Sequence, residues 1–161
     1  MDAVAALRAG EAVLLPTDTV YGLCTLPEHA RRLAELKRRP EDIPVATIYA
    51  SVDTAPELPE EARALLPGPY TFVFRGLGIR VPLLPAAAAE VVAAVGAVTA
   101  TSANLHGGAD PRRLDDVPAE IRAACGAEVD GGELPGLAST VVDLDGAEPV
   151  VLRQGAGPWP V

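Results

Sequence analysis

The sequence contains no apolar stretch long enough to cross a membrane. A spanning helix needs roughly 20 consecutive apolar residues, and the candidate runs are interrupted by charged residues, namely Arg8, Arg75, Arg80 and Glu90. The N-terminal stretch also lacks a basic leader followed by a long apolar segment and a small-residue cleavage site. We therefore expect a soluble, cytoplasmic protein without a membrane partner.

Cysteine is almost absent, and the signatures of several common catalytic sites are missing. Cys24 and Cys125 belong to no CxxC motif and to no His/Cys cluster, which argues against a zinc site and a disulfide framework. We expect both to be buried free thiols. The sequence also has no P-loop, no strand-borne GxGxxG, no HExxH and no GxSxG. If the protein handles a nucleotide, it does so by another route.

Basic residues are outnumbered by acidic ones, 13 to 22, and the formal net charge is −9 at pH 7. This charge disfavours a protein that coats nucleic acid through a broad basic face, although it allows a small basic pocket. The chain has 161 residues, of which 49% are hydrophobic, with 15 Gly and 16 Pro. These values predict a globular protein with many turns, organised as one domain over residues 1–161.

Short apolar runs alternate with helical patterns, and proline or glycine separates most of them. The patterns predict strands at about 11–15, 44–50, 70–75, 78–81, 97–101, 139–144 and 149–153. They predict helices at about 28–38, 59–66, 86–95 and 114–124. Because βαβ crossovers alternate with hairpins around Gly76 and Gly146, we expect an α/β (α+β) fold with a mixed sheet that carries helices.

Lys37 is the only lysine, whereas all other basic residues are arginines. It lies where the helix at 28–38 ends before Pro40, and a cation near a helix C-terminus complements the helix dipole. An interaction with the helix dipole would explain a positive charge at this position, but it would not explain why the residue is lysine and not arginine. A compact ammonium acts as a point charge on a crowded phosphate, which a planar guanidinium does less well. The residue type therefore favours a phosphate ligand.

Other rare polar residues occur in three further segments. Asn104 is the only asparagine, and Ser102 and Ser139 are two of only three serines. The loop PTDT adds Thr17 and Thr19, with Tyr21 close behind. Each segment taken alone is also compatible with a turn, and Tyr21 with a core position. Taken together, they indicate one anion-binding or carboxylate-binding site assembled from distant parts of the chain.

Seven motifs resemble those of the YrdC/Sua5/YciO family in order and approximate spacing. They cover residues 8–156 and read PTDTVYGL, KRRPEDIPV, PGPYTFVF, GIRVP, TSANLHG, STVVD and VLRQGA. The resemblance implies a twisted mixed β-sheet with flanking helices and a concave, locally basic cleft. The best-known members of the family are threonylcarbamoyl-AMP synthases, which supply the N6-threonylcarbamoyl modification (t6A) of adenosine 37 in tRNA. A nucleotidyltransferase activity is thus implied.

The resemblance also implies roles for individual residues. Four of them would be catalytic and bind ATP, with a fifth contacting the nucleotide: Lys37, Arg39, Ser102 and Asn104, then Arg153. Five would bind threonine: Thr17, Thr19, Tyr21, Arg80 and Ser139. The implied substrates are ATP, L-threonine and bicarbonate or CO₂, with Mg²⁺ bound mainly through ATP and no metal ligand expected from the protein. The implied partners are a downstream tRNA threonylcarbamoyl-transferase complex and, through a weak contact, tRNA.

Four positions depart from the family pattern. Ile43 and Ile48 stand where relatives often have Asn and His, and His106 replaces a serine. Asp110 stands, by spacing, where relatives often have a serine that contacts the nucleotide. From Ile48 we expect weaker discrimination of threonine from serine and valine. Two alternatives stay open: a divergent family member that binds nucleotide or RNA, and a synthase that acts on a different carbamoylated substrate.

Overall fold

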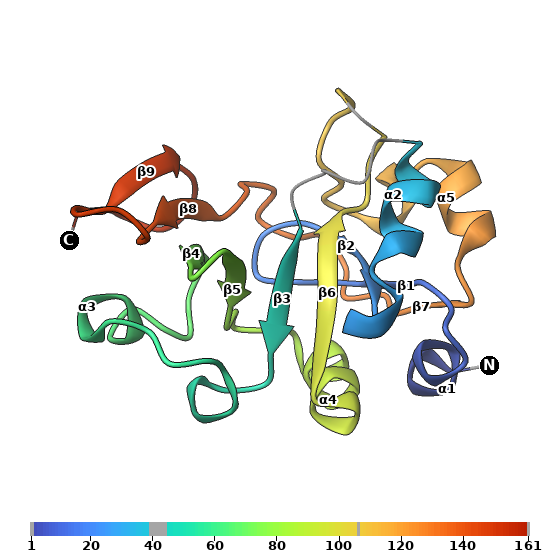
Figure 1. Cartoon of the computed structure of the whole chain (residues 1–161). Coiled ribbons are helices and arrows are strands. Elements are labelled where there is room, and N and C mark those ends of the chain that lie inside the picture. The colour runs from blue at the N-terminus through green and yellow to red at the C-terminus, as the bar shows by residue number, and fades with distance from the viewer. Residues whose placement is uncertain (1, 39–44, 106, 161) are drawn as a thin grey trace.

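A mixed nine-stranded β-sheet organises the protein, whose computed structural model describes residues 2–38, 45–105 and 107–160 (Figure 1). The strand order is β7-β1-β2-β6-β3-β5-β4-β8-β9. Pairs β1–β7, β3–β5 and β4–β8 are parallel and the other neighbours are antiparallel. The strands are β1 (Val13–Leu15), β2 (Gly22–Thr25), β3 (Ala46–Tyr49), β4 (Tyr70–Phe74), β5 (Leu77–Arg80), β6 (Ala97–Ser102), β7 (Ala127–Glu128), β8 (Thr140–Asp143) and β9 (Val150–Arg153).

Short helices cover both faces of the sheet. The helices are α1 (Ala3–Arg8), α2 (Arg31–Lys37), α3 (Glu60–Arg63), α4 (Ala86–Val95) and α5 (Ala119–Ala124), with 3-10 turns η1 (Pro27–His29), η2 (Val52–Thr54) and η3 (Leu114–Asp116). One hydrophobic cluster joins α1 and α4 to Val13 and Cys24. A second joins α2 and α5 to Leu14 and Leu23. Because successive side chains of a strand point to opposite faces, α1 and α4 lie on one face of β1 and β2, and α2 and α5 on the other.

The strands at the other end of the sheet also divide their side chains between two faces. Phe72 and Ile79 pack with α3 in a third hydrophobic cluster. Their neighbours Thr71, Val73 and Arg80 line a cavity instead. The alternation of strand residues therefore gives β4 and β5 one apolar face for the core and one face for a site.

Helix α2 ends at the residue that the sequence singles out. Arg38 has a left-handed backbone with φ of 55°, which stops the helix directly after Lys37. Lys37 is thus in the last helical turn, and its side chain is 5% exposed.

The expected mixed α/β architecture is confirmed, as are both hairpins, which form β4–β5 and β8–β9. The expected helices 28–38 and 114–124 are too long, because each divides into a 3-10 turn and a shorter α-helix. Helix α1 and strands β2 and β7 were not expected. All four residues of β2 are buried, so it shows no alternation of polar and apolar side chains, and β7 has only two residues. The single-domain organisation stays a prediction.

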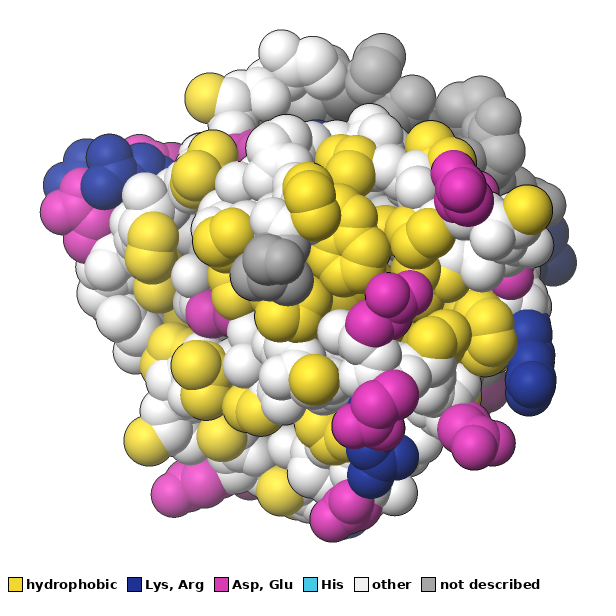
Figure 2. Space-filling model, turned by 90° about the vertical axis from the view of Figure 1, so that its left-hand side faces the viewer, with side chains coloured by type: hydrophobic (Ala, Val, Ile, Leu, Met, Phe, Trp, Pro, Cys, Tyr) yellow, Lys and Arg dark blue, Asp and Glu magenta, His cyan; other side chains and the backbone are white. Residues whose placement is uncertain are grey.

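Strand β9 forms one edge of the sheet and exposes Val150, Val151 and Leu152. Figure 2 shows this end of the molecule, where hydrophobic side chains gather at the centre of the face and many of the charged ones lie toward its margins. The longest described helix, α4, has 10 residues, and no helix in the described part of the chain has the length and hydrophobicity of a membrane span.

Both cysteines are free, with Cys24 buried and Cys125 half-buried. Burial raises the pKa of Cys24 to about 12 and that of Cys125 to about 11. Because the thiolate is the reacting form, we expect iodoacetamide at pH 8 to modify Cys24 at least about a hundredfold more slowly in the folded than in the unfolded protein. Mass spectrometry with and without denaturant measures this ratio, and equal rates would contradict the burial of Cys24.

Candidate functional site

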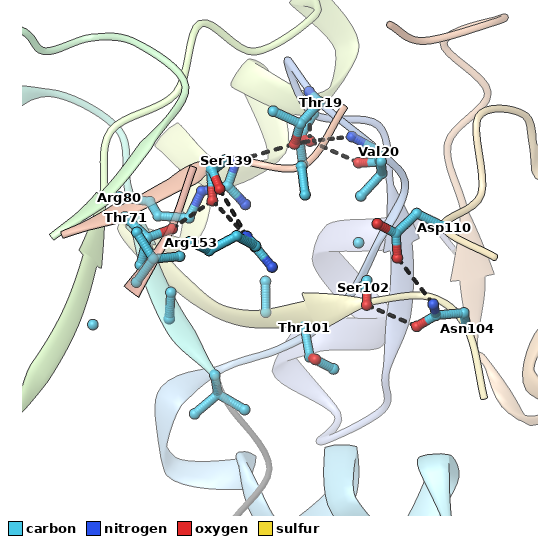
Figure 3. Close-up of a pocket in the computed structure, with 18 of the residues that line it drawn as sticks. Thr19, Val20, Thr71, Arg80, Thr101, Ser102, Asn104, Asp110, Ser139 and Arg153 are labelled. Atoms are coloured by element: carbon cyan, nitrogen blue, oxygen red, sulfur yellow. Dashed lines mark hydrogen bonds between the residues drawn. The ribbon is translucent and has the colours of Figure 1, made fainter. Parts of the chain in front are cut away.

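A cavity of about 570 Å³ lies over the polar face of the sheet, where α2, β3, β5, β6 and the segment before β8 meet (Figure 3). Among the residues that the structure describes, three cationic side chains line it, those of Lys37, Arg80 and Arg153. Asp110 is the one acidic side chain among the described residues that line it. In a protein with a net charge of −9, this local excess of cations suits the binding of an anion.

The ammonium group of Lys37 is surrounded by oxygen atoms of β6 and the loop that follows. Lys37 Nζ donates to the carbonyl oxygen of Ser102 at 2.9 Å and to Asn104 Oδ1 at 3.0 Å. It also lies 3.5 Å from Thr101 Oγ1 and 3.4 Å from Ser102 Oγ. Because α2 brings the side chain across the end of β6, the charge is fixed at the cavity wall.

Asn104 connects this ammonium group to an acidic residue. Its Oδ1 also accepts a hydrogen bond from Ser102 Oγ at 2.7 Å. Its Nδ2 donates to the carbonyl oxygen of Gly108 at 2.9 Å and to Asp110 Oδ1 at 3.0 Å. Three sequence-predicted residues, Lys37, Ser102 and Asn104, therefore form one hydrogen-bonded group.

Arg80 at the end of β5 forms an ion pair with Asp18 of the PTDT loop. Arg80 Nη2 lies 3.2 Å from Asp18 Oδ1, and each side chain is 12% exposed. Burial raises the pKa of Asp18 and lowers that of Arg80, in each case against the opposing effect of the partner charge. Desolvation therefore outweighs the mutual attraction of the two groups.

Two threonines hold the PTDT loop in place beside this pair. Thr17 Oγ1 donates to the carbonyl oxygen of Val20 at 2.6 Å and accepts from the backbone N–H groups of Thr19 and Val20. Thr19 Oγ1 lies 3.0 Å from Thr17 Oγ1 and accepts from Arg80 Nη2 at 3.4 Å. Both threonines line the cavity. Thr17 also stabilises the turn through the hydrogen bonds of its hydroxyl group to the backbone.

Ser139 and Arg153 meet at the same part of the cavity as Arg80 (Figure 3). Arg153 donates from Nε to the carbonyl oxygen of Ser139 at 2.9 Å and from Nη2 to Ser139 Oγ at 3.1 Å. Ser139 Oγ lies 2.7 Å from Thr71 Oγ1. The edge strand β9, all four of whose residues are exposed, thus places a guanidinium group at the cavity.

The cavity brings together most of the residues predicted from the sequence. Eight of them line it: Thr17, Thr19, Lys37, Arg80, Ser102, Asn104, Ser139 and Arg153. Tyr21 does not, which corrects its assignment to the threonine pocket. Its ring is fully buried in the core, and its hydroxyl donates to the carbonyl oxygen of Gly132 at 2.7 Å and accepts from the N–H of Gly131. The core position left open for Tyr21 is the observed one.

Positions 39, 43 and 106 lie outside the described residues, so the predictions for Arg39, Ile43 and His106 stay predictions. Ile48 is 1% exposed and packs in the cluster under α4, although it pairs in register with Arg80. It is not among the lining residues. The weaker discrimination of threonine from serine and valine that was expected from Ile48 stays a prediction, and the Ile48 side chain itself does not reach the cavity.

Three residues at the site were not assigned a role from the sequence. Asp18 lies inside the PTDT loop and its carboxylate was visible there, but nothing in the sequence indicated its pairing with Arg80. Thr71 follows from strand alternation once Phe72 is placed in the core. Asp110 was noted only as a departure, and its contact with Asn104 depends on a loop whose path the sequence does not fix.

Comparisons with known proteins agree with the fold and the motifs. A family model for the Sua5, YciO and YrdC proteins, with the description "Telomere recombination", matches residues 5–155. The threonylcarbamoyl-AMP synthase of Pyrococcus abyssi is 35% identical over 94% of this chain, and the chain spans 52% of that relative. A putative threonylcarbamoyl-AMP synthase of Mycobacterium tuberculosis is 33% identical over 96% of the chain and is itself covered to 83%. The crystal structure of P. abyssi Sua5 complexed with L-threonine superimposes with a TM-score of 0.86 at 32% identity, covering 95% of this chain and 53% of that one.

Proposed function

The chain belongs to the Sua5/YciO/YrdC family, and we propose that it synthesises threonylcarbamoyl-AMP and pyrophosphate from L-threonine, bicarbonate or CO₂ and ATP. The product supplies the t6A modification of tRNA at position 37. The observation that carries the proposal is that two polar groups of different chemistry line one cavity, the first around Lys37 and the second around Arg80.

The group around Lys37 suits a polyphosphate. Lys37 presents a compact charge, and the Ser102 hydroxyl next to it can donate a hydrogen bond to a phosphate oxygen. Arg153 adds a second cation from β9, with Nε and Nη2 already oriented by Ser139. These groups would neutralise charge that builds up as pyrophosphate leaves. Arg39 completes this set as a prediction from the motif.

The group around Arg80 suits an amino acid. A guanidinium recognises a carboxylate well, and Arg80 is held by Asp18 and Thr19. The hydroxyl groups of Thr19, Thr71 and Ser139 surround it and can hydrogen-bond the amine and hydroxyl of threonine. The structure of the relative from P. abyssi was solved in complex with L-threonine.

The chemistry does not require a protein base. The neutral amine of threonine attacks CO₂ to form a carbamate anion and releases one proton to solvent. A carbamate oxygen then attacks the α-phosphorus of ATP as the bond to pyrophosphate breaks. Because the nucleophile is already an anion, the protein has to align the two reactants and neutralise their charge.

Mg²⁺ fits this site as an ion held mainly by ATP. Within the described residues, no group of three or more His, Cys, Asp or Glu side chains could hold a metal. Bound to the triphosphate, Mg²⁺ would neutralise part of its negative charge. The Lys37 and Arg153 side chains would supply the remaining positive charge.

The cellular setting is likewise part of the proposal. A cytoplasmic synthase would pass its product to a separate tRNA threonylcarbamoyl-transferase complex, because the threonylcarbamoyl group must still be moved to adenosine. A weak direct contact with tRNA is compatible with this arrangement. The net charge of −9 argues for a small contact if there is one.

We expect pyrophosphate release from ATP and Mg²⁺ to require both threonine and bicarbonate. The nucleotide product, identified by mass spectrometry, should be threonylcarbamoyl-AMP. Parallel reactions with serine and valine test the substrate choice directly. Release at an unchanged rate when threonine or bicarbonate is omitted would count against a synthase, and a product built on another amino acid would redefine its substrate.

A further inference from the structure

The Asn104 side chain uses its full hydrogen-bonding capacity inside the protein. An amide oxygen has two lone pairs and an amide nitrogen two N–H groups. The oxygen accepts from Lys37 Nζ and Ser102 Oγ, and the nitrogen donates to Gly108 O and Asp110 Oδ1. Asn104 could contact a substrate only by giving up one of these bonds. Its geometry is that of a group that positions its neighbours.

The orientation of this amide follows from the charges on its two sides. An ammonium group can only donate hydrogen bonds, and an ionised carboxylate can only accept them. Turning the amide around would point its N–H groups at Lys37 and its oxygen at Asp110, so both contacts would become repulsive. Lys37 and Asp110 therefore select the same orientation from opposite ends.

Asp110 lies at the far end of this chain of contacts. It is exposed, so it contributes little to the core, yet its carboxylate is directed at Asn104 and the cavity (Figure 3). A negative charge on the N–H side of an amide polarises it and strengthens its oxygen as an acceptor. A carboxylate that faced a triphosphate with no cation between them would weaken binding, because the two charges have the same sign.

We propose that Asp110 is a positioning residue that holds the Lys37 ammonium group and the Ser102 hydroxyl in place through Asn104. What Lys37 then binds rests on the proposed function, whereas the positioning itself is a property of the ligand-free protein. Loss of Asp110 should let the ammonium group move, which lowers kcat. The same change removes a negative charge from the cavity, so KM for ATP should rise much less.

The sequence offers an unusual way to observe this directly. Lys37 is the only lysine in the chain, so labelling with ε-¹⁵N-lysine gives a single side-chain ammonium signal by NMR. The rate at which its protons exchange with water reports how firmly the group is hydrogen-bonded. The measurement needs neither substrate nor activity, so it separates failure of this proposal from failure of the proposed function.

We would compare three variants with the unmodified protein. Asp110→Ala removes the acceptor, and Asp110→Asn keeps a carbonyl oxygen for Asn104 but removes the charge. Asp53→Ala is the control, because Asp53 is an exposed acid that pairs with Arg63 away from the cavity. Asp110→Ala should speed ammonium exchange about tenfold, the effect of weakening a hydrogen bond to a charged group. Asp110→Asn should recover part of the protection, and Asp53→Ala should change nothing.

Kinetics give the second readout. In Asp110→Ala we expect kcat for pyrophosphate release to fall about tenfold and KM for ATP to change by less than about threefold. An ammonium signal that keeps its shift and exchange rate in Asp110→Ala would overturn the proposal, whatever happens to activity. An unchanged signal with a large rise in KM for Mg²⁺ or ATP would assign Asp110 to direct contact with the cation or the nucleotide instead.

Discussion

A Lys37→Arg variant should fold normally but lose about 10- to 150-fold in kcat/KM for ATP, which corresponds to roughly 1.5–3 kcal/mol. The ammonium nitrogen lies 2.9 Å from Ser102 O and 3.0 Å from Asn104 Oδ1, at the end of a side chain that is 5% exposed. A guanidinium is planar and larger, so its nitrogens cannot occupy this position together with the same oxygens. Pyrophosphate release at varied ATP concentration measures the loss.

The neighbouring residue provides a matched control. Arg38 follows Lys37 directly, but its side chain is 74% exposed and pairs with Glu120 on the surface. Surface ion pairs contribute little, so Arg38→Lys should change kcat/KM by less than about twofold. The contrast between the two substitutions tests the importance of residue type at position 37. If Lys37→Arg changed kcat/KM as little as Arg38→Lys does, any cation near the end of α2 would be sufficient.

The parts of the fold that the sequence predicts well are those in which one local pattern decides the structure. The run AAAAEVVAAV consists mostly of strong helix formers, contains no Gly or Pro, and forms α4 as expected. The hairpins around Gly76 and Gly146 follow from glycine-containing turns between apolar runs. The elements that were missed depend on tertiary contacts. Helix α1 has only six residues, and its stability comes from packing Ala6 and Leu7 against the sheet.

The site was predictable through residue type more than through position. Lys37 and Asn104 are each the only residue of their kind, and they are in direct contact in the structure. The error at Tyr21 has a simple cause, since a residue next to a site loop can face either the cavity or the core, and its neighbour Gly22 lines the cavity. The ion pair of Asp18 with Arg80 could not be predicted, because it joins residues 62 positions apart across strands whose register the sequence does not specify.

Removing the carboxylate of Asp18 should be among the most destabilising single changes around the cavity. Asp18 and Arg80 are each only 12% exposed, and Asp18 also accepts a hydrogen bond from the N–H of Leu83. Burial raises the pKa of Asp18 and lowers that of Arg80, so it favours the neutral form of each group. The charged pair as a whole is therefore costly to bury. Without Asp18 the charged Arg80 would remain buried alone. We expect Asp18→Ala to lower the free energy of unfolding by about 3–5 kcal/mol, measured by urea denaturation.

The double variant Asp18→Ala/Arg80→Met separates stability from function. Once both charges are gone, most of the lost stability should return, because an apolar side chain then fills the space without a desolvation cost. Binding of threonine, measured by calorimetry, should nevertheless be abolished, since the guanidinium assigned to its carboxylate, that of Arg80, is gone. This combination would mean that the buried pair is retained for binding and not for stability. A double variant no more stable than Asp18→Ala would contradict the coupling between the two charges, and undiminished threonine binding would remove Arg80 from the amino-acid site.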